Sequence, residues 1–432
     1  MKNHRYTLLI ATMILFALLS INNSALSTSN SLVDDFPAEE SSPSRIPSDT
    51  VIQFPDANFE AAVRRLIGKP EGDITASNVA GITELKVPHR DIVSLTGIEY
   101  FTALEVLECK GNRLTSLDMS KNLFLTMLDC RENLLTTVDV RNNLFLEIFI
   151  CDYNQITALD VRHNPMLAEL YCSENQLPML DVSQNLFLTM LDCRENLLTT
   201  IDIRNNLFLE IFLCDDNQIT TLDVSQNVAL TELYCAENRL TELDLRDNPM
   251  LIHLACQLNQ LSALDVSRNP KLEELYCEWN SLTTLDVSQN PALTRLGCHT
   301  NQLTTLDVSH NPALEALRCG NNPLTTLDVS QNPALKELSC IHNHLATLDV
   351  SQNPALVKLR CDSNQLMTLD VSHNPALEDL SCDRNQLTTL DVSHNPALDL
   401  LFCQNNLFAD QSAIIGLDED SVYFVFNPQN TI

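Results

Sequence analysis

Hydrophobic and polar positions repeat every 21 residues through most of this 432-residue chain. In LEELYCEWNSLTTLDVSQNPAL, residues 272–293, Leu275 and Cys277 alternate with Glu274 and Tyr276, which predicts a short strand with one buried face. The return segment TTLDVSQNPAL is too short for a helix flanked by two turns, and its frequent proline disfavours a helix interior. We therefore predict an α/β solenoid that is mainly β, with extended or 3₁₀ structure on its outer side.

Four residue types keep fixed columns through these turns. The fifteen cysteines run from Cys109 to Cys403 at intervals of 21, and an asparagine follows each by three positions. An aspartate nine positions after the cysteine and a second asparagine thirteen positions after it recur through the first fourteen units. Because no unit contains an insertion, neighbouring strands can pair as a parallel sheet with about 4.8 Å per turn, on the order of 70 Å in total. Residues 120–161 also recur almost unchanged at 183–224, three turns later.

The spacing of the cysteines indicates whether they are free thiols, disulfides or metal ligands. Each takes the place of an inward-pointing leucine, and a buried free cysteine behaves as a small hydrophobe. Disulfides between turns are disfavoured, because in-register neighbours hold their Cβ atoms near the strand spacing and because fifteen is an odd number. A single column also cannot surround a tetrahedral metal ion. We expect buried, unpaired thiols.

The polar columns predict capping of the backbone. The first asparagine column is expected to satisfy backbone groups in the turn after the strand, since a buried amide must be hydrogen-bonded. The aspartates either accept a hydrogen bond from a backbone N–H two or three residues on, as in Asx turns, or form a row of calcium ligands. We favour the Asx turn, because the chain has only 8 glycines and lacks the glycine-rich spacing of calcium-binding repeats.

Both ends of a solenoid need caps, because an open end would expose its core. FPDANFEAAVRRLIG, residues 54–68, predicts a helix with Asp56 as its N-cap and Gly68 as its stop, and a short second helix is expected after Thr75. SVYFVFN, residues 421–427, predicts a strand that covers the final turn. These signals place a helical N-cap at 51–84, the repeats (one irregular turn and fifteen regular ones) at 85–405, and a C-terminal cap at 406–432.

Residues 1–27 are predicted to be a signal peptide. A basic start precedes an apolar run, Leu8–Leu19, that is too short to span a bilayer, and the small residues Ala25 and Ser27 fit a cleavage site. An uncleaved anchor is the alternative. Residues 28–50 are rich in Ser, Pro and acids, which predicts a disordered linker. We therefore expect a secreted, extracellular protein that does not insert into a membrane after signal cleavage.

The net charge of the chain disfavours some classes of binding partner. It has 57 acidic and 26 basic residues, a net charge of −31, which repels phosphate backbones and anionic lipid heads. Nucleic acid and membrane surfaces are therefore not expected partners, whereas basic partners are. No nucleophile elbow, phosphate loop or metalloprotease motif is present, so we expect neither an enzyme nor a cofactor. Weak metal binding by the stacked pair His373 and His394 is the minor alternative.

The segments IQFPDANFEAAVRRLIG, ITASNVAGITEL and IVSLTGIEYFTALEVLEC together resemble the N-terminal helical cap of the internalins, secreted and surface leucine-rich repeat proteins of bacteria. The 21-residue unit with a cysteine in its ladder resembles the internalin J subgroup, and the similarity covers roughly residues 51–405. It implies a right-handed leucine-rich repeat solenoid with a parallel concave sheet. It also implies a non-enzymatic role in adhesion or host interaction, and hence in virulence. No immunoglobulin-like or mucin-binding module and no wall-anchoring signal follows the repeats, so we expect either release from the cell or retention at the cell surface by a partner.

Aromatic residues gather at the strand positions expected to face the concave surface, which are three and one residues before the cysteine and one and two residues after it. Exposed Tyr and Trp on a rigid surface are typical of binding hot spots, although aromatics also suit sheet surfaces in general. The residues that we predict to bind a ligand are Tyr153, Tyr171, Tyr234, Tyr276, Trp279, Arg295 and Arg318.

Charge is segregated along the same face. Acidic residues from Glu169 to Glu278 fill its first two-thirds, and arginines and histidines from Arg295 to Arg384 make its last third mixed to basic. We predict a protein or glycan ligand centred near Trp279, with a basic region facing the acidic stretch. The alternative is a structural or self-associating protein of an extracellular matrix or biofilm, without a discrete ligand.

Overall fold

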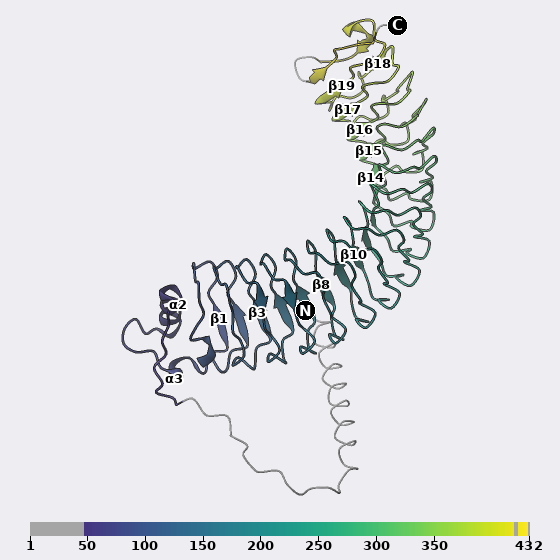
Figure 1. Cartoon of the computed structure of the whole chain (residues 1–432). Helices are drawn as coiled ribbons and strands as arrows, with labels where there is room; N and C mark the ends of the chain where they lie inside the picture. Colours follow the sequence, from purple (N-terminus) through teal and green to yellow (C-terminus); the bar gives the residue numbers. More distant parts are fainter. Residues whose placement is uncertain (1–46, 419–421, 431–432) are drawn as a thin grey trace, which may run out of the picture.

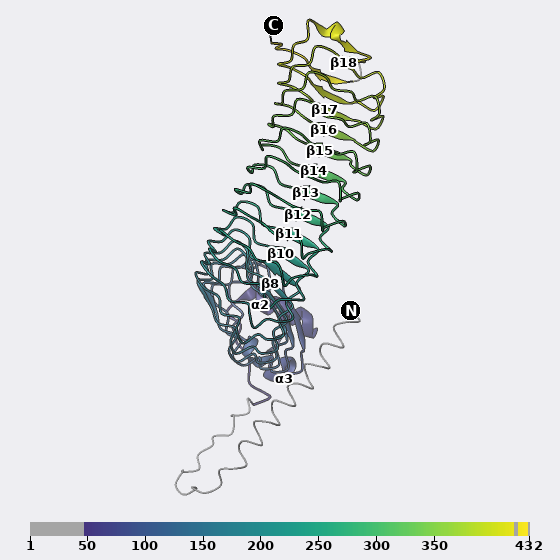
Figure 2. The same ribbon diagram turned by 90° about the vertical axis from the view of Figure 1, so that its right-hand side faces the viewer.

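Each 21-residue unit forms one turn of a solenoid in the computed structural model, which describes residues 47–418 and 422–430. The turns stack into a long curved body whose strands line the inner side of the curve (Figure 1). Figure 2 shows the same turns stacked in sequence order from the N-terminal cap to the C-terminal one. The signal peptide predicted at 1–27 and most of the linker predicted at 28–50 lie outside the described residues.

The concave sheet is parallel, and every strand pairs with the strand one turn away. Leu275, for example, lies opposite Leu254 on one side and Leu296 on the other. Its 17 described strands are β1 (Glu84–Lys86), β2 (Val106–Glu108), β3 (Met127–Asp129), β5 (Ile148–Ile150), β7 (Glu169–Tyr171), β8 (Met190–Asp192), β9 (Ile211–Leu213), β10 (Glu232–Tyr234), β11 (His253–Ala255), β12 (Glu274–Tyr276), β13 (Arg295–Gly297), β14 (Ala316–Arg318), β15 (Glu337–Ser339), β16 (Lys358–Arg360), β17 (Asp379–Ser381), β19 (Leu400–Phe402) and β21 (Tyr423–Val425).

The outer side carries little regular structure, as the short return segment predicts. β4 (Thr137–Val138) pairs with β6 (Ala158–Leu159), and β18 (Leu390–Asp391) pairs with β20 (Ile414–Ile415). Most of the remaining outer segments are turns. The 3₁₀ helices of the described chain, η2 (Ile98–Tyr100) and η3 (Gln411–Ala413), lie outside the regular repeats, so the outer side follows the extended one of the two predicted alternatives.

In the described chain, two helices precede the first strand of the concave sheet, and one strand of that sheet follows the last regular turn. Helix α2 (Ala57–Ile67) begins at Asp56, whose carboxylate accepts hydrogen bonds from two backbone N–H groups of the first turn, and ends at Gly68 with φ 65°. Helix α3 (Ala76–Val79) follows Thr75, which closes a capping box. At the other end β21 pairs with β19. The helices of the described chain are too short and too polar to traverse a bilayer.

The interior is built from aligned columns of small and medium apolar side chains. All fifteen cysteines are buried and unpaired, in one column beside the leucines of the sheet. Burial raises the pKa of thiols such as Cys130 and Cys277 well above the ordinary value, because a thiolate loses its hydration there. The prediction of buried, free thiols is therefore confirmed.

Polar ladders join the turns. The Asn301 amide donates to the carbonyls of Cys277 and Cys298 at 3.0 and 3.1 Å, and its oxygen accepts from Leu282 N at 2.9 Å. The second asparagine column donates to the preceding turn in the same way, as Asn290 does to Val266 O at 2.9 Å. These bonds confirm that the asparagines satisfy backbone groups.

The aspartate column forms Asx turns. The Asp286 carboxylate accepts from Ser288 N at 2.9 Å, and equivalent contacts recur from Asp118 to Asp391. Over the described residues, no group of three or more His, Cys, Asp or Glu side chains is placed to hold a metal ion. The Asx-turn interpretation is confirmed.

We predict that native protein reacts with a thiol reagent at almost none of its cysteines, because the reactive thiolate is suppressed and the sulfur atoms are covered. After unfolding in denaturant without a reductant, all fifteen should react, as counted by mass spectrometry after alkylation. Labelling of fewer than half of them in the unfolded, unreduced protein would show that disulfides join the turns.

Candidate functional site

The concave sheet presents two outward columns per strand, three residues and one residue before the cysteine. In β12 these are Glu274 and Tyr276, both half-buried, while Leu275 between them is buried. Parallel register then sets Tyr276 directly between Ala255 and Gly297 of the neighbouring turns. The outward side chains of the face therefore form aligned columns, and a small residue in a column leaves a hollow beside a larger neighbour.

The residue two positions after each cysteine lies just beyond the end of the strand, and its backbone is left-handed. Trp279 has φ 54° and Tyr153 has φ 53°, and their side chains are 54% and 53% exposed. Gly111 and Asn321 hold the same position in other turns at little cost, whereas a bulky residue there costs on the order of 1 kcal/mol. Glu, Leu, Thr, His and Arg occupy the same left-handed position in other turns, so this column exposes whichever side chain it carries, and at Trp279 that side chain is a large aromatic.

The residue directly after the cysteine, predicted to project outward, is partly exposed in some turns, as at Arg194, and buried in others. Asp152 and Glu278 are each only 7% exposed, because their side chains fold along the sheet toward the next turn. Of the acidic residues expected to line the face, Asp192 is also buried. The acidic character of the face therefore comes partly from carboxylates that lie within the side-chain layer.

A small hollow of about 30 Å³ lies on this face across β12, β13 and β14. It is lined by Tyr276 from β12, Arg295 from β13 and Arg318 from β14, together with Leu296, Gly297 and Ala316. The Tyr276 hydroxyl donates to Glu274 Oε2 at 3.2 Å, and Glu274 also pairs with Arg295 at 3.3 Å. Arg318 pairs with Glu337 at 3.1 Å. Three of the seven predicted residues therefore meet in one place.

The hollow owes its shape to Gly297. A Cβ atom at this position would lie 1.8 Å from Glu278 Oε1, so only glycine leaves room for that carboxylate. Glu278 Oε2 has no hydrogen-bond partner among the described residues, and burial raises the pKa of Glu278 against the opposing charge of Arg318. A buried carboxylate with one unsatisfied oxygen thus lies beside the predicted hot spot. The sequence alone did not reveal that Gly297 leaves space for the Glu278 carboxylate.

Trp279 contacts the next turn through His299. Its indole meets the His299 ring edge-on, with ring centroids 6.3 Å apart. Burial lowers the pKa of His299, and the charge of Arg318 lowers it further, so this imidazole is neutral at physiological pH. Tyr234 lies two strands away in β10, near the cluster but outside the hollow.

The other predicted residues form a separate, acidic region. Tyr171 donates to Glu169 at 3.0 Å, and burial raises its pKa to about 12. Asp152 accepts from the backbone and hydroxyl of Ser173, while burial raises the pKa of Asp152 to about 6. Asp215 has its pKa raised to about 6 in the same way. From β7 to β12 the face extends over five strand spacings, roughly 24 Å.

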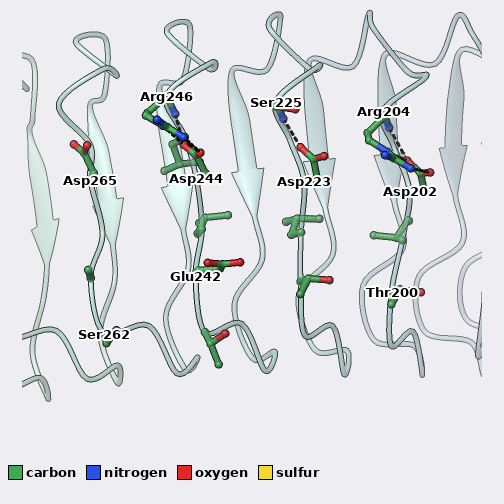
Figure 3. Close-up of a pocket in the computed structure, with 17 residues that line it drawn as sticks. Thr200, Asp202, Arg204, Asp223, Ser225, Glu242, Asp244, Arg246, Ser262 and Asp265 are labelled. Carbon is green, nitrogen blue, oxygen red and sulfur yellow. Dashed lines mark hydrogen bonds and ion pairs between the residues drawn. The ribbon is translucent and has the colours of Figure 1, made fainter.

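Larger hollows lie on the outer side and were not expected. One, of about 820 Å³, runs across four turns, with the strands of the concave sheet behind it (Figure 3). Its arginines are already paired within their own turns, Arg204 with Asp202 and Arg246 with Asp244, while Ser225 N donates to Asp223 (Figure 3). Its polar groups are therefore largely satisfied, unlike Glu278 on the concave face.

No family model and no curated protein sequence matches the chain. Solved structures do. The functional domain of InlJ from Listeria monocytogenes, which includes a cysteine ladder, is 38% identical, covers 82% of this chain and 80% of its own, and gives a TM-score of 0.80. The leucine-rich repeat protein LIC12759 of Leptospira interrogans is 26% identical over 72% of this chain and 86% of its own, with a TM-score of 0.66.

The internalin InlF of Listeria monocytogenes, at 22% identity over 83% of this chain and 96% of its own, shares the fold with a TM-score of 0.58. These neighbours confirm the predicted leucine-rich repeat architecture. An identity of 38%, sustained through the ladder that InlJ also contains, shows that the chain belongs to the internalin family of leucine-rich repeat proteins.

Proposed function

We propose that this internalin is a secreted or surface-associated protein that binds a protein or glycan ligand on its concave face, in adhesion or host interaction. The observation that carries the proposal is Trp279, a half-exposed aromatic three residues after Tyr276, which lines the hollow. A half-exposed indole contributes little to the core. A large exposed aromatic on a rigid concave surface is typical of a binding hot spot.

The hollow supplies the polar part of the contact. Arg295 and Arg318 are about half exposed, and their ion pairs with Glu274 and Glu337 are of the solvated kind that exchanges at little cost. A ligand carboxylate or hydroxyl can replace these partners, while the tyrosine and tryptophan rings cover apolar surface. This is the usual division between an aromatic centre and a polar rim.

The acidic region favours a protein over a glycan. Asp152 follows β5 and Asp215 follows β9, six and three strand spacings from β12, so one ligand that contacts both regions must span roughly 29 Å. Basic side chains on that ligand would face carboxylates whose hydration is already reduced. A protein surface of standard size has this reach.

The first test exchanges the hot spot for residues that the chain itself uses in the same columns. Tyr276→Ser copies Ser339 and Ser381, and Trp279→Asn copies Asn321 and Asn405, so the turn geometry is preserved. We expect the double variant to be at least as stable in urea unfolding and to lose about 100-fold in affinity for any ligand captured on an array of extracellular proteins and glycans. Met179→Ala, a 74% exposed residue on the outer side, is the control. Full binding by the double variant would place the ligand elsewhere.

The second test uses pH. Asp152 and Asp215, with pKa values of about 6, lose their charge as the pH falls from 7.5 to 5, so binding of a basic ligand should weaken by about tenfold. Unfolding is not the cause, because groups whose pKa is raised in the folded state bind more protons there and stabilise the fold as the pH falls through 6. The variant Asp152→Asn with Asp215→Asn should bind equally at both pH values in calorimetry. An equal loss in wild type and variant would contradict the assignment.

A further inference from the structure

A stripe of exposed apolar residues follows the corner where each turn passes from the outer side to the concave sheet. Six of the fourteen corners read Asn-Pro-Ala-Leu, but two pairs of turns have Asn-Leu-Phe-Leu instead. We name these residues the corner stripe: Leu123, Phe124, Leu144, Phe145, Leu186, Phe187, Leu207 and Phe208.

The corner stripe is held open to solvent by the ladder beneath it. Its residues are between 45% and 57% exposed, except Phe187, which is half-buried and stacks on Phe208 with ring centroids 6.4 Å apart. The Asn143 amide directly before Leu144 donates to Asn122 O of the preceding turn at 2.9 Å, which fixes adjacent corners side by side. The leucine and phenylalanine after the asparagine therefore cannot turn inward, since the next leucine already fills the core position.

The area is large for a free surface. A half-exposed phenylalanine contributes about 100 Å², and with four leucines the stripe reaches on the order of 700 Å². Soluble monomers rarely leave an apolar patch of this size uncovered. The area approaches the roughly 800 Å² that each partner contributes to a stable protein interface.

The two margins of the stripe differ in charge. On the outer margin, the two residues before the corner asparagines include Lys121, Arg141, Arg162 and Arg204, and the three arginines pair with Asp139, Asp160 and Asp202 of their own turns. On the concave margin, the residue before each strand is Glu147 or Glu210 in two turns and uncharged in the other turns of this segment. The basic side chains therefore lie on the outer margin and the two glutamates on the concave margin.

We propose that the corner stripe is the interface with a second copy of this chain, related by a two-fold axis that runs along the solenoid. Such an axis keeps the two solenoids parallel. Across the interface, the columns of the second copy (arginine margin, leucines, phenylalanines, glutamate margin) then run in the opposite order to those of the first. The leucine column of one copy then meets the phenylalanine column of the other. Arg141 and Arg204 of one copy face Glu147 and Glu210 of the second copy, whereas an antiparallel pair would set arginine against arginine.

The duplication in the sequence fits this arrangement. The segment 120–161 recurs at 183–224, so the second block of the stripe repeats both the apolar residues and the charged margins of the first. Both blocks can then make the same contact at once. A lipid surface is a poorer occupant, because a chain of net charge −31 is repelled by anionic headgroups.

The test compares the secreted chain with a variant in which all four Leu-Phe pairs become Pro-Ala, as at residues 291–292. In sedimentation velocity we expect wild type to dimerise with a Kd of about 10 µM or below and the variant to remain monomeric at 100-fold higher concentration, with the same circular dichroism spectrum. A wild type that stays monomeric, a variant that still dimerises, or a wild type that instead floats with neutral lipid vesicles would overturn the proposal.

A second experiment uses charge-reversal variants to test whether the two copies pack in parallel. Arg141→Glu with Arg204→Glu should weaken the dimer about tenfold, and adding Glu147→Arg with Glu210→Arg should restore it; no restoration would contradict the parallel pairing. The variant Tyr276→Ser with Trp279→Asn should dimerise as wild type does. Loss of ligand binding and loss of dimerisation are therefore distinguishable.

Discussion

The structure depends on hydrogen bonds that each asparagine side chain makes to the backbone of the turn before it. A solenoid turn without helix or long strands has many backbone groups that would otherwise be buried unpaired. Asn301, for example, satisfies Leu282 N and two carbonyls at once. These bonds can recur only if every turn has the same length, so the ladder imposes the 21-residue period. The small volume of cysteine suits a turn so tightly closed.

Strict alignment also determines how the surface can vary. A substitution in one turn always lies beside the same position of the next, so the surface is a set of columns in which large and small side chains are chosen turn by turn. Gly297 beside Glu278 produces the concave hollow in this way. The Leu-Phe corners produce the stripe in the same way, on a different column. Neither feature perturbs the buried leucines, cysteines and asparagines, which explains how one repeat can carry two distinct surfaces.

The sequence predicted the fold to the level of single strands because period and burial are local properties of the repeat. The N-cap at Asp56, the free thiols and the Asx turns followed from residue chemistry alone. The site was predicted only in part. Tyr276, Arg295 and Arg318 line one hollow, a grouping that the sequence did not single out, and Glu278 folds inward because a glycine one turn later leaves space for it. The left-handed backbone at Trp279 and the exposure of Phe124 depend on how the turn closes, which the hydrophobic pattern does not encode.

The central claim, that the ladder enforces the period, is tested most directly by deleting residues from one turn and measuring urea unfolding by circular dichroism. Removal of residues 309–329, one whole unit, should leave a folded protein with an unchanged spectrum per residue and a slightly smaller dependence on urea. Removal of 309–328, one residue fewer, should misalign every column beyond Val308 and destroy cooperative unfolding. Equal behaviour of the two deletions would contradict the account.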